Sequence, residues 1–268
     1  MSPFFKLYSK IRSTSSNPLN KKKEFCDFGN GKKVPSQIKE EALEYINEAF
    51  ELFKLDLFDE AEESLNIAVK LDDTISDIYG IRALIKFATD RVDSALEDLD
   101  IAIKLNPNDP ILYLHKALIL SEKDDNESIK NFNIAEKTFI ETGLPITTQF
   151  YISRGKTYLT IEEYQKAFDD FTTAIELDSD ILAYFFRGKI SNVFGDFESA
   201  LNDLNSCIEQ DSEFISAYVN RAFIHFKLKE YFDARSDLIK AIELEPELYD
   251  SEIIRDLLEK IDGRINYT

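Results

Sequence analysis

A tyrosine recurs through this sequence at an almost constant interval, and the interval limits the folds open to the chain. The copies are separated by 34, 34, 38, 33 and 34 residues: Tyr45, Tyr79, Tyr113, Tyr151, Tyr184 and Tyr218. Four positions after each tyrosine comes a small residue: Ala49, Ala83, Ala117, Gly155, Gly188 and Ala222. Positions i and i+4 share one face of an α-helix, so each pair predicts a helix that admits a close neighbour.

A second apolar pattern follows each of these predicted helices. It begins with a small residue at Ala61, Ala95, Ser128, Ala167, Ala200 and Ala234. Four residues later stands a bulky one at Leu65, Leu99, Phe132, Phe171, Leu204 and Leu238. Seven residues after the first comes another small one at Ala68, Ala102, Ala135, Ala174, Cys207 and Ala241. This spacing places all three on one stripe of a second helix, which predicts repeated pairs of antiparallel helices.

In this order and within 34 residues, these patterns resemble the tetratricopeptide repeat. The resemblance covers residues 42 to about 248, although tyrosine stands throughout where the family usually has tryptophan. The third unit also loses one residue before Ser128, and its second helix is expected to extend toward Gly143. The resemblance implies an all-α, right-handed superhelical solenoid of antiparallel helix pairs.

The expected organisation is a basic arm over residues 1–38 and a solenoid over 39–268. Within the solenoid we place six repeats near 42–75, 76–109, 110–147, 148–180, 181–214 and 215–248. Residues 249–264 form an amphipathic pattern that carries Ile253, Ile254, Leu257, Leu258 and Ile261. We expect this helix to cap the apolar face of the last hairpin.

Comparison of the six copies with one another predicts a structural ion pair. Three residues after the tyrosine stand Glu48, Arg82, Lys116, Arg154, Arg187 and Arg221. Three residues after the first small residue of the second helix stand Ser64, Asp98, Asn131, Asp170, Asp203 and Asp237. Arginine and aspartate occur together in four copies and are absent together in two. We therefore interpret them as partly buried pairs that join the two helices of a repeat, and not as ligand-binding residues.

Charge is divided unevenly along the chain, which has a formal net charge of -19. Residues 1–38 hold 8 Lys/Arg against Glu24 and Asp27, whereas residues 39–268 hold 24 basic and 49 acidic residues. Because an acidic solenoid repels phosphate backbones, we expect no nucleic-acid partner. No apolar run approaches the roughly 20 residues that span a bilayer.

The basic arm leaves three interpretations open. It is a flexible tail, a targeting or membrane-surface segment within residues 1–23, or a segment that docks against the solenoid. We expect a cytoplasmic protein, with a mitochondrion or another organelle as the alternative if residues 1–23 are a targeting peptide.

The sequence carries no recognisable catalytic or metal-binding motif. His115 and His225 lie in different repeats without ligands at zinc-type spacing, and Cys207 stands where the other copies have alanine. Cys26 lies in the arm. We therefore expect no enzymatic activity, no metal and no cofactor.

The resemblance places a partner in a concave groove formed by residues one, five and eight after each tyrosine. Thirteen of these eighteen residues are large and apolar and none is acidic. Together with Asn220, which falls at one of the family's clamp positions, the predicted groove residues are Phe50, Phe53, Phe87, Lys156, Phe185, Lys189, Asn192, Asn220, Phe223 and Phe226. Phe50, Phe53, Phe185, Phe223 and Phe226 are expected to be exposed, and the alternative for the Leu, Ile and Val positions is ordinary core.

A groove of this composition favours a scaffold that binds a protein, through a peptide or an amphipathic helix. One alternative is an organellar or membrane-associated assembly or import factor directed by the arm. Another is self-association through the apolar groove. The weakest is a clamp-type co-chaperone, because the family's clamp positions hold Ile152, Lys156, Phe186, Ser216 and Asn220, and none of them matches.

Overall fold

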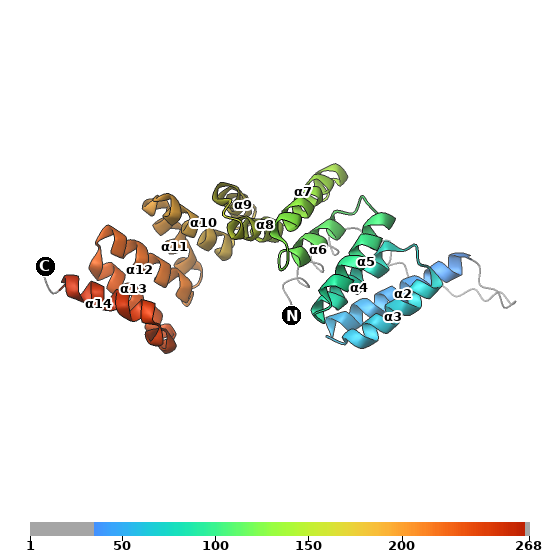
Figure 1. Ribbon diagram of the computed structural model, residues 1–268, viewed down its shortest axis with the longest axis horizontal. Coiled ribbons are helices and arrows are strands. Elements are labelled where there is room, and N and C mark those ends of the chain that lie inside the picture. The colour runs from blue at the N-terminus through green and yellow to red at the C-terminus, as the bar shows by residue number, and fades with distance from the viewer. Residues whose placement is uncertain (1–34, 266–268) are drawn as a thin grey trace. The chain divides into compact units, whose positions relative to one another are not determined.

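The computed structural model describes residues 35–265, which form thirteen α-helices, one short 3-10 helix and no strand (Figure 1). Successive helices pack as antiparallel pairs, so the predicted all-α class and the repeated hairpins are confirmed. The predictions for residues 1–34 of the arm, including Cys26 and the targeting segment, lie outside the described residues, whereas residues 35–38 belong to the first described helix. None of the helices within 35–265 has the length and apolarity needed to cross a bilayer.

The chain divides into two compact units, with the boundary between Ile146 and Thr147. This boundary lies within the one tyrosine interval that departs from 33 or 34 residues, between Tyr113 and Tyr151. Each unit contains three helical hairpins and is described by itself.

Unit 1 contains the first three hairpins. Its first helix begins four residues before the predicted start of the solenoid at residue 39. The helices are α2 (Pro35–Lys54), α3 (Phe58–Leu71), α4 (Ser76–Ala88), α5 (Val92–Leu105), α6 (Pro110–Leu120) and α7 (Asp125–Thr142).

Unit 2 contains the other three hairpins and a final helix. Its elements are α8 (Thr148–Thr160), α9 (Tyr164–Leu177), α10 (Ile181–Phe194), α11 (Phe197–Gln210), α12 (Ile215–Leu228), α13 (Tyr231–Leu244), η2 (Pro246–Asp250) and α14 (Glu252–Ile265).

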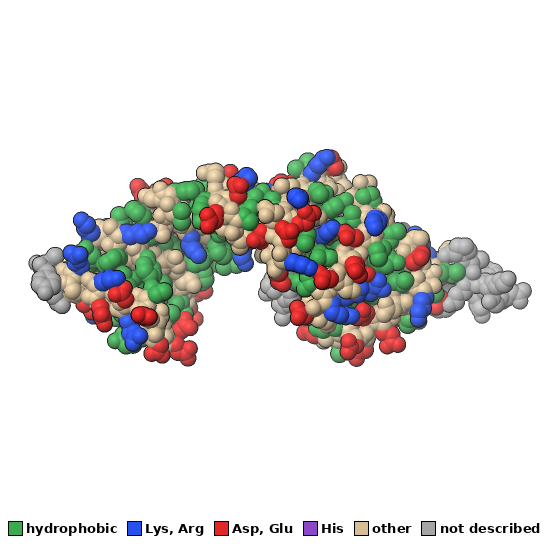
Figure 2. Space-filling view, viewed as in Figure 1, with side chains coloured by type: hydrophobic (Ala, Val, Ile, Leu, Met, Phe, Trp, Pro, Cys, Tyr) green, Lys and Arg blue, Asp and Glu red, His purple; other side chains and the backbone are tan. Residues whose placement is uncertain are grey.

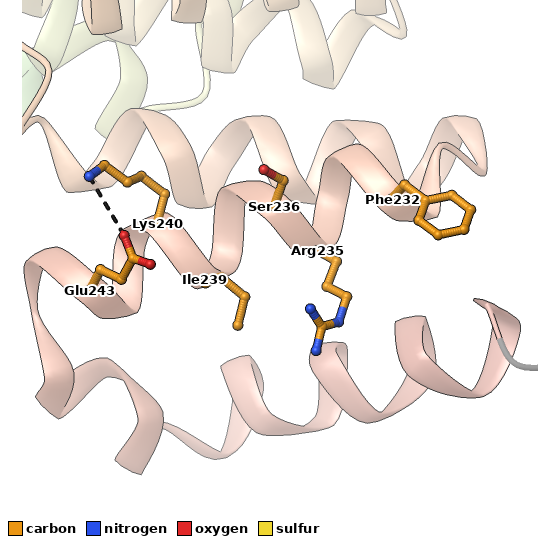
Figure 3. Close-up of a pocket in the computed structure, with 6 residues that line it drawn as sticks. All are labelled: Phe232, Arg235, Ser236, Ile239, Lys240 and Glu243. Atoms are coloured by element: carbon orange, nitrogen blue, oxygen red, sulfur yellow. Dashed lines mark ion pairs between the residues drawn. The ribbon is translucent and has the colours of Figure 1, made fainter.

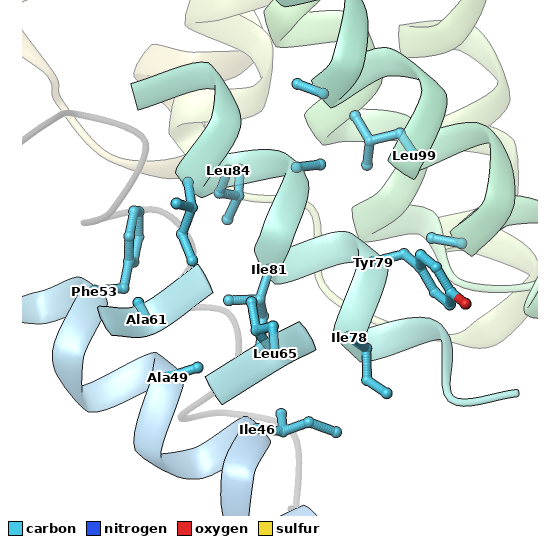
Figure 4. Packing of buried hydrophobic residues seen from close by; sticks show 14 of the residues in the cluster. Ile46, Ala49, Phe53, Ala61, Leu65, Ile78, Tyr79, Ile81, Leu84 and Leu99 are labelled. Atoms are coloured by element: carbon cyan, nitrogen blue, oxygen red, sulfur yellow. The ribbon is translucent and has the colours of Figure 1, made fainter. Parts of the chain in front are cut away.

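The small-bulky-small stripe of each second helix is fully buried, as its spacing predicts. In unit 1, Ala61 and Leu65 of α3 pack against Ala49 of α2 and Ile81 of α4 in one cluster (Figure 4). Each of the six bulky residues is 0% exposed. Burying a leucine contributes roughly 2 kcal/mol, so this repeated stripe supplies much of the hydrophobic stabilisation.

The turn inside each hairpin has a conserved backbone geometry within this chain, with one exception. Eleven residues after the tyrosine the backbone enters the left-handed region, at Asp56, Asp90, Glu162, Gly195 and Lys229. The third hairpin has no such residue, because it is shorter at this turn by the one residue that the sequence lacks before Ser128. There the side chain of Asp124 accepts a hydrogen bond from Glu127 N–H and caps α7 instead.

Helix α7 is longer than the other second helices, which confirms the predicted extension. It has 18 residues where the others have 14, and it ends on Gly143 at a φ of 68°. Glycine adopts this left-handed conformation at little cost, so Gly143 fixes the C-terminus of the extended helix.

Three of the repeated tyrosines anchor the loop that leads into their own helix. The hydroxyl groups of Tyr79, Tyr113 and Tyr218 each donate to the carbonyl six residues earlier, on Asp73, Pro107 and Ser212. The distances are 3.2, 3.1 and 3.2 Å. Tyrosine therefore contributes both packing and a polar contact at this position.

Helix α14 caps the last hairpin, as predicted. Ile254, Leu257, Leu258 and Ile261 are buried against Leu238 and its neighbours. Ile253, which the sequence placed with them, is 68% exposed, so that part of the prediction is wrong. It lies at the first turn of α14, one residue out of phase with the buried face.

Candidate binding surface

The predicted arginine–aspartate pairs are present and structural. In each of the four copies Nε and one Nη of the arginine donate to both carboxylate oxygens of the aspartate, at 2.6–2.9 Å. Asp98, Asp170, Asp203 and Asp237 are 2%, 5%, 5% and 5% exposed. The hydrogen bonds to aspartate raise the pKa of Arg82, Arg187 and Arg221, against the opposing effect of burial. These arginines join the two helices of a hairpin, which supports their interpretation as structural residues.

The two copies without this pair use other contacts. Ser64 donates from its hydroxyl to Glu48 Oε2 at 3.3 Å, within the first hairpin. Lys116 instead donates to Asp100 of the preceding hairpin at 2.6 Å. Both copies belong to unit 1, so all three hairpins of unit 2 contain the bidentate pair and only one hairpin of unit 1 does.

In unit 1 the predicted groove positions are mostly buried. Ile46, Leu84, Leu114 and Leu118 are at most 9% exposed, which fits the alternative that such positions are core. Phe53 is 7% exposed, so its predicted exposure is wrong, because its ring packs in the unit 1 core and lies 5.7 Å from Phe58. Phe50 and Phe87 are half-buried against the same core.

In unit 2 most of the same positions reach the surface, although Ile152 is 1% exposed. Lys156 of α8 and Lys189 of α10 are exposed, and Phe185 of α10 and Phe223 and Phe226 of α12 are half-buried. These predicted residues all lie on the first helices of one unit. We call this group the Lys–Phe surface: Lys156, Phe185, Phe186, Lys189, Phe223 and Phe226.

The two lysines of the Lys–Phe surface converge on one aromatic ring. Their Nζ atoms lie 5.8 and 5.9 Å from the ring centroid of Phe186, and Lys189 Nζ also lies 5.5 Å from that of Phe185. Neither lysine has a carboxylate within 4.0 Å among the described residues. Two ammonium groups around one ring, without an acid to neutralise them, form a site that attracts an anion.

The aromatic residues behind these lysines are held by ring contacts. Phe186 stacks on the buried Phe171 at 5.3 Å, and Phe185 packs edge to face on both Phe186 and Phe214. Phe186 was not among the predicted groove residues. The sequence signal for Phe186 is its position next to Phe185, because the two rings pack against each other.

The two predicted asparagines have partners inside the protein. Asn192 accepts a hydrogen bond from Lys227 Nζ at 2.8 Å, which links α10 to α12. Asn220 donates through Nδ2 to the carbonyl of Ser216 one turn earlier, at 2.7 Å. Both side chains are partly exposed.

A shallow pocket of about 400 Å³ lies elsewhere, along one face of α13 beside α14 (Figure 3). Phe232 stands at one end and is 70% exposed, and the ion pair of Lys240 with Glu243 stands at the other. Arg235 is paired with Asp262 of α14 at 2.8 Å. None of the predicted groove residues lines this pocket.

On the face that Figure 2 displays, acidic and basic side chains are interspersed on both units, with hydrophobic side chains between them. The negative charge is therefore not gathered into one patch there.

The cysteine and histidine residues differ sharply in their surroundings. Burial raises the pKa of the Cys207 thiol to about 12, and its Sγ–H donates to the carbonyl of Ile181. A thiol held protonated in this way is a poor nucleophile.

His115 is 2% exposed within α6. His225, in contrast, reaches a polar cluster at the turn from α12 to α13 together with Glu230 and Asp233.

Comparison with known proteins supports the repeat assignment. The family model described as the tetratricopeptide repeat matches residues 148–181 and 215–248, which are the fourth and sixth repeats. No curated protein matches the sequence.

Several solved structures share the fold at low sequence identity. PilF of Pseudomonas aeruginosa has a TM-score of 0.69 and 12% identity over 85% of this chain and 99% of its own. YrrB, described as a TPR protein with an unusual peptide-binding site, has a TM-score of 0.64 and 19% identity over 74% and 99%. MamA has a TM-score of 0.55 and 21% identity over 62% and 95%.

Proposed function

We propose that this chain, a tetratricopeptide-repeat protein, is a non-catalytic scaffold that binds a peptide or an amphipathic helix of a partner protein on the Lys–Phe surface. Tetratricopeptide repeats commonly mediate protein–protein interaction and peptide binding, and YrrB is described as having a peptide-binding site. The observation that carries the proposal is the pair of unneutralised lysines on Phe186 in a chain with a net charge of -19.

The chemistry of the surface indicates what kind of segment it would accept. Phe185, Phe223 and Phe226 are half-buried, so each offers part of a ring to a second apolar side chain. Lys156 and Lys189 would meet a carboxylate of the same segment. A ligand with apolar side chains and at least one acidic residue satisfies both features.

Substitution of the surface tests this proposal. The double variant Phe185→Glu, Phe223→Glu introduces two charges among the rings and should weaken a partner's binding by about a hundredfold, as the loss of two central aromatic contacts does. Partners would be identified by affinity capture with the wild-type chain, and their dissociation constants then measured with purified proteins.

A matched control separates loss of the surface from general damage. Phe194→Glu, Phe232→Glu makes the same chemical change at two residues that are 51% and 70% exposed and lie outside the Lys–Phe surface. It should leave binding unchanged. If the surface variant stays folded by circular dichroism and retains every partner, binding occurs elsewhere.

A further inference from the structure

The turn between α12 and α13 gathers three side chains whose ligand atoms lie close together. His225, Glu230 and Asp233 each offer one nitrogen or oxygen, and these atoms all lie within 4.8 Å of one another. His225 Nδ1 is already 2.6 Å from Glu230 Oε2. His225 comes from the last turn of α12, Glu230 is the residue before α13, and Asp233 lies in the first turn of α13.

We propose that His225, Glu230 and Asp233 form a binding site for a divalent transition-metal ion of the zinc type. A neutral imidazole and two carboxylates are ligands that zinc accepts at about 2.0 to 2.2 Å, with water in the fourth position. Magnesium and calcium prefer oxygen ligands throughout, so the imidazole favours the transition metals.

The second nitrogen of His225 lies near a carboxylate but outside hydrogen-bond distance. Nε2 lies 3.9 Å from Asp237 Oδ2, and Asp237 is held in place by two hydrogen bonds from Arg221. A carboxylate that comes within hydrogen-bond distance of the non-ligating nitrogen would fix the orientation of the ring. Nδ1 is placed in the cluster by its 2.6 Å contact with Glu230 Oε2.

Comparison among the repeats shows that this cluster is particular to the last hairpin. At the position of His225 the other copies have Leu52, Lys86, Leu120, Tyr158 and Ser191. Lys86 makes an ion pair with Asp98 at 2.8 Å, the counterpart of the contact between His225 and Asp237. A lysine at this position therefore fits the hairpin and satisfies the aspartate, so packing does not require histidine.

The bound ion would join the end of α12 to the start of α13. Lys229, the first of the two residues between them, has a φ of 65°, a backbone conformation that is unfavourable for residues with a side chain. Three ligands across this turn would hold it closed. The expected consequence is a metal-dependent increase in the stability of the hairpin against which α14 packs.

Zinc binding to the full chain tests the proposal. All proteins carry Cys26→Ser, so that the arm thiol does not contribute. Competition with a chromophoric chelator should show one equivalent of Zn²⁺, and the melting temperature should rise with Zn²⁺ but not with Mg²⁺. His225→Lys, which places the residue of the second repeat here, and Asp233→Asn should each weaken binding at least about tenfold.

Glu198→Gln is the matched control, since it removes an exposed acid from the first turn of the preceding second helix, and it should bind Zn²⁺ normally. Circular dichroism checks that the variants fold. The proposal is overturned if the chain binds no Zn²⁺ at one equivalent, or if His225→Lys and Asp233→Asn bind it as the control does.

Discussion

Unit 1 and unit 2 are built from the same repeat, yet they use the first-helix positions differently. The residue five positions after the tyrosine is Leu84 in the second repeat and Phe223 in the sixth. Leu84 is 4% exposed, whereas Phe223 is half-buried and belongs to the Lys–Phe surface. An equivalent place thus belongs to the core in the second repeat and to the surface in the sixth.

The two units also differ in the contacts that hold their hairpins and end their helices. Every hairpin of unit 2 contains a bidentate arginine–aspartate pair, and two hairpins of unit 1 do not. In the last turn of the second helices, unit 1 has Lys70 and Lys104, whereas Glu176 and Glu209 stand at the same positions in unit 2. Local stability is therefore distributed differently in two halves that share one fold.

The largest effect is expected from placing one charge at equivalent positions. Leu84→Glu puts a carboxyl group into the core of unit 1, where desolvation opposes ionisation, and should lower the free energy of unfolding by about 5 kcal/mol. Phe223→Glu should cost about 1 kcal/mol, because this side chain is only half-buried and the new carboxylate can reach water. Urea denaturation followed by circular dichroism compares the two, and equal losses would remove the distinction between the units.

An intermediate effect is expected from the ion pairs. Arg187→Ala leaves Asp203 buried without its guanidinium partner and should lower the free energy of unfolding by about 3 kcal/mol. Lys116→Ala removes only the pair with Asp100, whose side chain is 53% exposed, and should cost less than about 0.5 kcal/mol.

A second variant checks the cause of the arginine effect. Arg187→Ala, Asp203→Ala removes both partners and should be more stable than Arg187→Ala alone, because no charge then remains buried. If the double variant is the less stable of the two, the loss comes from packing and not from the unpaired aspartate.

The smallest effect concerns the helix ends. Glu209 lies at the negative end of the α11 dipole, so Glu209→Lys should stabilise the protein by about 0.5 kcal/mol at low salt. Lys104→Glu in α5 should destabilise it by a similar amount. Thermal unfolding at low and high salt measures both shifts, and effects that persist in 1 M salt would have another origin.

The repeating parts of the fold could be predicted because they depend on local spacing. Small and bulky residues at i, i+4 and i+7 occupy one side of a helix whatever surrounds it, and six copies report the same arrangement. The pairing of Arg82 with Asp98 could be predicted for a related reason. Among the six copies, arginine and aspartate occur at these two positions either together or not at all. Gly143 similarly marked where the long α7 ends.

The candidate site could be predicted only in outline. The positions of Phe53 and Phe223 follow from the repeat, but their exposure depends on which side chains lie on neighbouring helices. The convergence of Lys156 and Lys189 on Phe186 joins two different hairpins, and no spacing rule within one hairpin contains it. The sequence does not predict a metal site at His225, because Glu230 and Asp233 stand five and eight residues later, across a left-handed turn.

The sequence by itself determined the helical hairpins, their ion pairs and the capping helix, since each depends on periodicity within a few tens of residues. The tertiary structure decided which equivalent positions are buried, which lysines converge and which acids reach His225. These depend on contacts between helices that only the packed chain brings together.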